Sequence, residues 1–209
     1  MTPFQMNLYV VDDDEAVRRA IALLLISRGF KVQAFASGDA FLEGAVLDAP
    51  GCVILDLRMD GLSGLQVFEH LRTSASPLMV IFLSGHGDIT LATEAMRNGA
   101  SIWLPKPCSD ERLLDEVQRA LAASAEVATR QAERRQAVQA WETLTPREKA
   151  VAQLLSLDLP NKEISRRLVP PCDPRTVESH RARIYDKLGT TSVTEIARIA
   201  THATAAERT

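Results

Sequence analysis

The sequence predicts a doubly wound α/β domain, a long helical linker and a small all-α domain. Three observations support this fold class. Short apolar runs alternate with segments of helical periodicity through the first half of the chain. No Gly or Pro occurs from Ser109 to Thr145. The remaining residues contain only helix-like segments, and 209 residues suffice for two small domains.

Five short apolar runs predict the strands of the first domain. They are Leu8–Val11, Lys31–Phe35, Cys52–Leu55, Leu78–Leu83 and Ser101–Leu104. A strand–helix alternation predicts a parallel sheet covered on both faces. At this size we expect the flavodoxin-like order 2-1-3-4-5, with functional sites at the carboxyl ends of the strands.

Helical periodicity and capping residues place the helices between these strands. The expected segments are Val17–Leu25 ended by Gly29, Ala40–Leu47 capped by Ser37 or Asp39, Gly64–Leu71, Asp88–Arg97 ended by Gly99, and a helix from Ser109 or Asp110. The last helix keeps an apolar stripe from Leu114 to Ala132, which indicates one long helix. Two helices with a break near Ser124 are the alternative. The expected boundaries are 5–123, 124–140 for the linker, and 141–205.

The last domain is predicted to contain four short helices. Thr145, Pro146 and Glu148 form a capping box with Pro at the first helical position, and this helix is expected to reach about Leu157. The later segments are Lys162–Leu168 capped by Asn161, the turn Val169–Asp173, Pro174–Leu188 capped by Asp173 and ended by Gly189, and a helix from Ser192 to about His202. Two short helices joined by a turn predict a helix-turn-helix.

Composition narrows the class of protein. No apolar run approaches the roughly 18–20 residues of a membrane span, and Met1–Asn7 lacks the features of a signal peptide. We therefore expect a cytoplasmic protein without a membrane partner. Three scattered cysteines, Cys52, Cys108 and Cys172, fit reduced thiols better than disulfides or a zinc site.

Carboxylates follow two strands that are neighbours in the expected sheet. Asp12 and Asp13 follow the first strand and Asp56 follows the third, so they should share one crevice. Clustered carboxylates repel each other unless a cation is present, and a half-open oxygen site suits Mg²⁺. Lys106 and Ser84 end two further strands and can reach the same crevice. A carboxylate nucleophile, a metal and hydrogen-bond donors are what an aspartyl-phosphate requires. Taken singly, each Asp also fits a helix cap, and Lys106 a surface residue.

The segment Lys162–Lys187 is locally basic, with seven basic and four acidic residues in a chain of net charge −3. Its long helix predicts a face for double-stranded DNA. Glu178, Ser179 and Ala182 are the expected base readers. Backbone contacts are expected from Lys162, Arg175, Thr176, His180, Arg181, Arg183 and Lys187. A solvated helix face, or a domain that binds only protein, is the alternative.

Four motifs resemble the receiver domain of response regulators. They are Val10-Val11-Asp12-Asp13-Asp14, Leu55-Asp56-Leu57-Arg58-Met59, Leu83-Ser84-Gly85-His86-Gly87 and Pro105-Lys106-Pro107. The resemblance implies Asp56 as phosphoacceptor for a sensor histidine kinase. It implies Mg²⁺ held by Asp12, Asp13, Asp56 and the Arg58 carbonyl. Ser84 and Lys106 would hold the phosphoryl group, with Trp103 at the switch position that is usually Tyr or Phe.

The second domain resembles the LuxR-type helix-turn-helix. The matching motifs are Leu144-Thr145-Pro146-Arg147-Glu148, Asn161-Lys162-Glu163-Ile164 and Arg175-Thr176-Val177-Glu178-Ser179-His180. The whole chain is thus similar to the NarL/FixJ group of two-component regulators. That resemblance implies phosphorylation-switched, sequence-specific DNA binding that regulates transcription. It further implies a homodimer in the phosphorylated or DNA-bound state through the last helix, and RNA polymerase is a further candidate partner.

The chain departs from these family patterns at four places. Asp60 replaces a usual Pro, Trp103 is bulkier than the usual switch residue, and Cys108 replaces a usual Phe. The turn Val169–Asp173 is about two residues longer than usual, and this turn sets the angle of the recognition helix. A constitutive DNA-binding regulator with a vestigial receiver is therefore the alternative function. A phosphatase-like enzyme is disfavoured because no cap domain or general acid beside Asp56 is evident, so we expect no enzyme.

Overall fold

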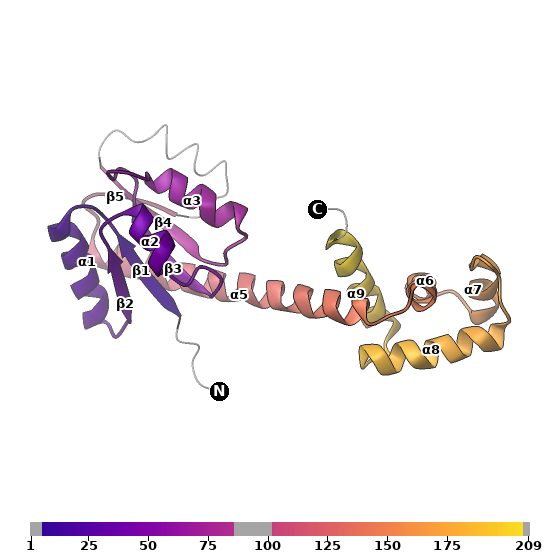
Figure 1. Ribbon diagram of the computed structural model, residues 1–209. Coiled ribbons are helices and arrows are strands. Elements are labelled where there is room, and N and C mark those ends of the chain that lie inside the picture. Colours follow the sequence, from indigo (N-terminus) through magenta and orange to yellow (C-terminus); the bar gives the residue numbers. More distant parts are fainter. Residues whose placement is uncertain (1–5, 86–101, 207–209) are drawn as a thin grey trace. The chain divides into compact units, whose positions relative to one another are not determined.

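A computed structural model describes residues 6–85 and 102–206 of the chain (Figure 1). The chain divides into two compact units between Thr129 and Arg130. The predicted helix Asp88–Arg97 and its stop at Gly99 lie outside the described residues. No helix within the described residues is both long and apolar enough to cross a membrane.

The first unit contains a five-stranded parallel sheet in the order β2-β1-β3-β4-β5, which confirms the predicted topology. The strands are β1 (Asn7–Val11), β2 (Val32–Phe35), β3 (Gly51–Asp56), β4 (Met79–Ser84) and β5 (Ile102–Pro105). The described helices are α1 (Glu15–Ser27), α2 (Gly38–Gly44), α3 (Gly64–Thr73) and α5 (Asp110–Glu142). Ser37 caps α2 as predicted, since its hydroxyl accepts from the Ala40 N–H.

The sheet separates two apolar layers, as the doubly wound fold requires. Alternate strand residues such as Val10, Ile54 and Ile81 pack with α1 and α5 on one face. Their neighbours, such as Val11, Leu55 and Phe82, pack with α2 and α3 on the other. Burial on both faces explains why β3 and β4 are nearly continuous apolar runs in the sequence.

The long helix α5 is continuous over 33 residues, so the prediction of one helix is confirmed and the alternative break near Ser124 is wrong. Ser124 is instead fully buried in the first unit. Its hydroxyl donates to the Pro77 carbonyl at 2.6 Å and accepts from the Gly51 N–H at 2.8 Å. This side chain therefore joins α5 to the segments where β3 and β4 begin.

We expect Ser124→Ala to destabilise the first unit by about 1–3 kcal/mol, because two buried backbone groups lose their partner. Urea unfolding of the full chain measures this change. Thr129→Ala is the matched control, because the exposed Thr129 hydroxyl bonds only within the helix, to the Ala125 carbonyl. The control should shift stability by less than about 0.5 kcal/mol. Equal effects of the two substitutions would contradict the buried bridge.

The second unit packs four helices against the end of α5. These are α6 (Pro146–Leu155), α7 (Asn161–Arg167), α8 (Pro174–Leu188) and α9 (Val193–Ala206). Their core includes Val151, Ile164, Ile184 and Ile196, together with Trp141 from α5. The predicted capping box of Thr145 and Glu148 is present, Asp173 caps α8, and Gly189 ends α8 with φ of +64°.

One predicted cap in this unit is wrong. Asn161 does not cap α7, because it is the first residue of that helix, Pro160 occupies the cap position, and no side chain caps the helix. The Asn161 amide oxygen instead accepts a hydrogen bond from Arg181 of α8 at 2.8 Å. A charged donor on the neighbouring helix thus takes the oxygen that a cap would have used.

Candidate functional site

An acidic crevice lies where β1 and β3 end. Asp12 and Asp13 directly follow β1, Asp56 is the last residue of β3, and the two strands are paired in parallel. One carboxylate oxygen from each of the three residues lies within 4.8 Å of the other two. Asp12 is buried, Asp56 is 9% exposed and Asp13 faces solvent. The crevice is therefore open on one side.

Lys106 places a cation against two of these carboxylates. Its Nζ lies 2.6 Å from Asp12 Oδ2 and 3.0 Å from Asp56 Oδ2. Its backbone N–H donates to the Ser84 carbonyl at the adjacent end of β4. Ser84 is itself buried. The structure thus brings the ends of four strands together, as the strand-end rule predicted.

The electrostatics of the crevice favour a further cation. Burial raises the pKa of the Asp56 carboxyl above its ordinary value, and the Asp12 charge adds to this, while Lys106 and the Arg58 N–H act in the opposite direction. Burial lowers the pKa of Lys106, but hydrogen bonds from its ammonium to Asp12 and Asp56 outweigh burial and raise it. One ammonium beside three carboxylates leaves net negative charge. An open set of three carboxylates fits Mg²⁺, the ion that receiver domains generally bind at such a pocket.

Neighbouring residues hold this crevice in shape. Asp14 caps α1, because its carboxylate accepts from the Ala16 and Val17 N–H groups. Arg18 of α1 donates to the Asp12 carbonyl at 2.7 Å and to the Asp13 carbonyl at 3.3 Å. Sequence reasoning missed Arg18, because an Arg on an amphipathic helix usually lies at the solvated face.

The start of α3 also approaches the crevice closely. A Cβ on Gly64 would lie 2.3 Å from the Asp56 carbonyl oxygen, so only glycine permits this approach. The Gly64 N–H donates to the Leu57 carbonyl, which anchors the residues after β3. Larger residues at position 64 would displace the Asp56 backbone.

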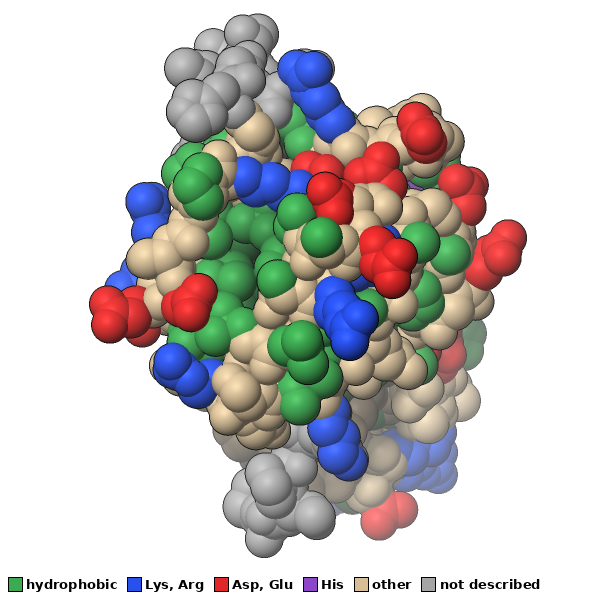
Figure 2. All heavy atoms as spheres, turned by 90° about the vertical axis from the view of Figure 1, so that its left-hand side faces the viewer, with side chains coloured by type: hydrophobic (Ala, Val, Ile, Leu, Met, Phe, Trp, Pro, Cys, Tyr) green, Lys and Arg blue, Asp and Glu red, His purple; other side chains and the backbone are tan. Residues whose placement is uncertain are grey.

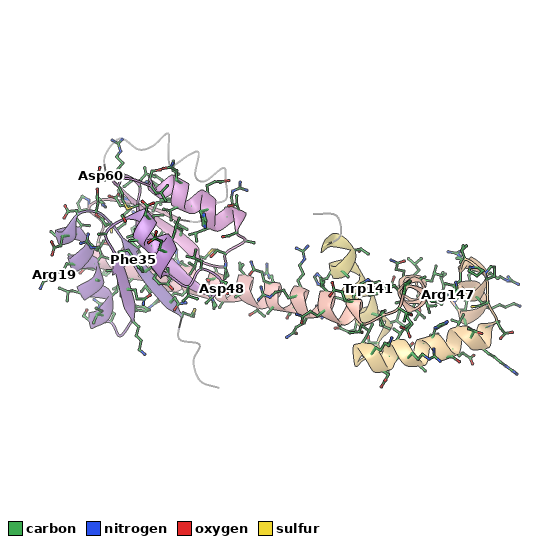
Figure 3. The ribbon with its side chains drawn as sticks, in the orientation of Figure 1. Arg19, Phe35, Asp48, Asp60, Trp141 and Arg147 are labelled. Atoms are coloured by element: carbon green, nitrogen blue, oxygen red, sulfur yellow. The ribbon has the colours of Figure 1, made fainter. Side chains whose placement is uncertain are left out.

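An open pocket of about 530 Å³ adjoins the crevice. It is lined by Asp13, Leu57, Arg58, Met59, Asp60, Ser63 and Leu65. Asp60 is exposed and is not among the three gathered carboxylates (Figure 3). Acidic side chains gather on the face of the first unit drawn in Figure 2, beside a hollow with hydrophobic side chains. Trp103 is half-buried, with its ring centroid 5.5 Å from that of Phe82.

The second candidate surface is the outer face of α8. Val177 and Ile184 are buried in the core, which turns the opposite side of the helix outward. Besides Lys187, which is also exposed, six of the predicted DNA-contacting residues on α8 are exposed, namely Arg175, Thr176, Glu178, Ser179, Ala182 and Arg183. Lys162 is exposed near the start of α7. These residues are thus available to an external partner.

Three other residues predicted to contact DNA are engaged or covered inside the unit. Arg181 donates to Asn161 and to the Tyr185 hydroxyl, using all three guanidinium nitrogens. Lys187 Nζ lies 2.7 Å from the buried carboxylate of Glu148. His180 is half-buried, and its Nδ1 has no hydrogen-bond partner among the described residues. Sequence reasoning could not find Asn161 and Glu148 as partners, because they lie 20 and 39 positions away from Arg181 and Lys187.

The apolar stripe predicted on the last helix lies largely in the core. Ile196 and Ala200 are buried, and Val193 and Ala197 are half-buried. This stripe therefore stabilises the unit itself. A dimer contact through α9 would use its remaining, outward side chains.

Both halves of the chain match known protein families. Residues 8–118 match the response regulator receiver domain, and residues 142–200 match the bacterial regulatory proteins of the luxR family. The chain is 36% identical to the transcriptional regulatory protein FixJ of Bradyrhizobium diazoefficiens, over 94% of this chain and 95% of that protein. It is 39% identical to the tetrathionate response regulatory protein TtrR of Salmonella typhimurium, over 92% and 90% of the two chains.

Solved structures align over nearly the whole chain. The response regulator StyR aligns with a TM-score of 0.80 at 35% identity, covering 93% of this chain and 98% of that one. Full-length FixJ from B. japonicum aligns with a TM-score of 0.56 at 35% identity, covering 96% and 98%. The fold and the acidic crevice define a receiver domain. With its LuxR-type DNA-binding domain, the chain belongs to the NarL/FixJ group of response regulators, the transcriptional regulators of two-component systems.

Proposed function

We propose that Asp56 accepts a phosphoryl group and that this modification switches DNA binding by the second unit. The observation that carries the proposal is the gathering of Asp12, Asp13 and Asp56 within 4.8 Å, with Lys106 Nζ 3.0 Å from Asp56. The Asp56 carboxylate oxygen attacks phosphorus, and the bond from phosphorus to the donor breaks. With a phosphohistidine kinase as donor, the imidazole leaves and takes a proton; with acetyl phosphate, acetate leaves.

The other residues have separate roles in this proposal. Asp12, Asp13, Asp56 and the Arg58 carbonyl hold Mg²⁺, which neutralises charge on the phosphoryl oxygens when bound. Lys106, whose Nζ lies 3.0 Å from Asp56 Oδ2, donates to a phosphoryl oxygen. The Ser84 hydroxyl, at the end of β4, donates to another, and Trp103 responds as the switch residue.

Intact mass after incubation with Mg²⁺ and acetyl phosphate tests the phosphoacceptor. We expect one phosphoryl adduct on the wild type and none on Asp56→Asn. Asp48→Asn is the matched control, because Asp48 is exposed and lies at the opposite end of the unit from Asp60 (Figure 3). This control should be modified as the wild type is. An adduct on Asp56→Asn, or none on the folded wild type, would contradict the assignment.

For the second unit we propose double-stranded DNA as the partner of the exposed α8 face. Glu178, Ser179 and Ala182 read base edges, while Arg175, Thr176, Arg183 and Lys162 contact the phosphate backbone. The engaged side chains of Arg181 and Lys187 hold the helices together instead. A homodimer on paired half-sites, with RNA polymerase as a further partner, completes the proposal for a cytoplasmic regulator.

Arg175 and Glu178 should differ in how they affect binding. Arg175→Ala should weaken binding about equally for all duplexes and reduce the slope of log affinity against log salt by about one. Glu178→Gln should change the preferred sequence with little change in this slope. Selection from a random pool, followed by salt-dependent titrations, separates the two effects. If Arg175→Ala changed the preferred DNA sequence and Glu178→Gln did not, the roles assigned to the two residues would be reversed.

A further inference from the structure

The connection between α7 and α8 has few hydrogen-bond donors of its own. Pro170 and Pro171 have no N–H group, so neither donates to a carbonyl within the connection. Apolar packing does not hold it either, because Val169 is 90% exposed. This segment, Val169–Pro171, therefore needs support from elsewhere in the unit.

Arg147, near the start of α6, provides that support. Its Nη1 donates to the Val169 carbonyl at 3.0 Å and its Nη2 to the Pro170 carbonyl at 2.6 Å. The planar guanidinium suits two adjacent acceptors, whereas a lysine ammonium is a single point donor. Among the described residues, these are the only side-chain hydrogen bonds to Val169–Pro171.

The anchored segment leads directly into the recognition helix. The Cys172 N–H returns to the Ser165 carbonyl of α7, and the Cys172 side chain packs against the core. Asp173 then caps α8 by accepting from the Arg175 N–H at 2.8 Å. The path from Leu168 to Asp173 fixes where α8 begins, and Arg147 holds the outer part of that path against α6.

We propose that Arg147 is a positioning residue for DNA binding. Its bidentate bonds to the long α7–α8 turn set the orientation of α8, and its charge does not serve as a phosphate contact. This inference rests on the proposed DNA binding. It assigns to Arg147 the support of the exposed segment Val169–Pro171.

Arg147→Lys tests the inference, because it keeps the charge and removes the fork. The probe is a duplex selected from a random-sequence pool by the wild-type full chain, titrated with Mg²⁺ and acetyl phosphate present over a range of salt concentrations. We expect affinity to fall about tenfold with an unchanged salt slope, as expected when positioning rather than a phosphate contact is lost. Hydrogen exchange of the Cys172 amide should accelerate. Lys149→Gln, which removes a charge from the same helix, should change neither the affinity nor the Cys172 exchange rate.

A second variant checks that the turn is the target. Deleting Val169 and Pro170 removes both acceptor carbonyls, so Arg147→Lys should have no further effect in that background. Two results would overturn the proposal. The first is near-normal DNA binding by Arg147→Lys together with a salt slope reduced by about one in Arg147→Ala, which would indicate a phosphate contact. The second is an unchanged Cys172 exchange rate in Arg147→Lys. If the wild type selects no duplex, both the proposed DNA binding and the positioning role fail. Faster Cys172 exchange in Arg147→Lys would then still show that the Arg147 hydrogen bonds hold the segment Val169–Pro171.

Discussion

Glu148→Ala should destabilise the second unit by about 3 kcal/mol. The Glu148 carboxylate is 3% exposed and accepts from the Thr145 N–H, the Thr145 hydroxyl and Lys187 Nζ. Its removal breaks the reciprocal half of the capping box and leaves Lys187 without its carboxylate partner. Because Lys187 is partly exposed, water relieves part of the cost.

The same carboxylate should make stability depend on pH. The hydrogen bond from Lys187 lowers the pKa of Glu148 from 4.5 to about 2, against the opposing effect of burial and with help from Thr145. A carboxyl whose pKa is lower in the folded state contributes its full stability above the unfolded pKa of 4.5. That contribution, on the order of 2–3 kcal/mol, is lost as pH falls from about 4.5 toward 2.

Urea unfolding followed by Trp141 fluorescence measures both effects. Trp141 is buried in the second core, and a Trp103→Phe background removes the signal from the first unit. The difference in stability between the wild type and Glu148→Gln should shrink as pH decreases from 6 to 3. Glu142→Gln is the control, because Glu142 is exposed at the end of α5. A constant difference across this pH range would contradict the ion pair.

Phosphorylation of Asp56 should raise the affinity of the full chain for its selected duplex by about 5–150-fold, the usual range of coupling between two sites. The physical requirement is a difference in free energy between two states of the chain that phosphorylation biases. A dianionic phosphoryl group on Asp56 would rearrange the contacts that Lys106 now makes with Asp12 and Asp56. Titration of the duplex with and without acetyl phosphate measures the shift.

The fold and the acidic crevice could be predicted because each follows from a local rule. Continuous apolar runs located the strands, a period of 3.6 located the helices, and parallel strand ends necessarily meet at one edge of the sheet. The grouping of Asp12, Asp13, Asp56 and Lys106 therefore followed from the sequence, and the structure confirms it.

The sequence did not show which side chains have partners far away in the chain. Asn161 has the residue type of a helix cap, yet Arg181, 20 positions later, takes its oxygen. Lys187, which is predicted to contact the DNA backbone, also has a partner that the sequence did not show, because Glu148 lies 39 positions earlier. Local propensity ranks what a residue does without competition, and only tertiary structure shows which partner is nearby.

One measurement tests the central claim most directly: the affinity of the wild type and of Asp56→Asn for the selected duplex, each with Mg²⁺ and with or without acetyl phosphate. A phosphorylation-switched regulator predicts that acetyl phosphate tightens binding by the wild type alone. Equal, tight binding by both proteins under both conditions would contradict the switch and establish the alternative, a constitutive DNA-binding regulator with a vestigial receiver.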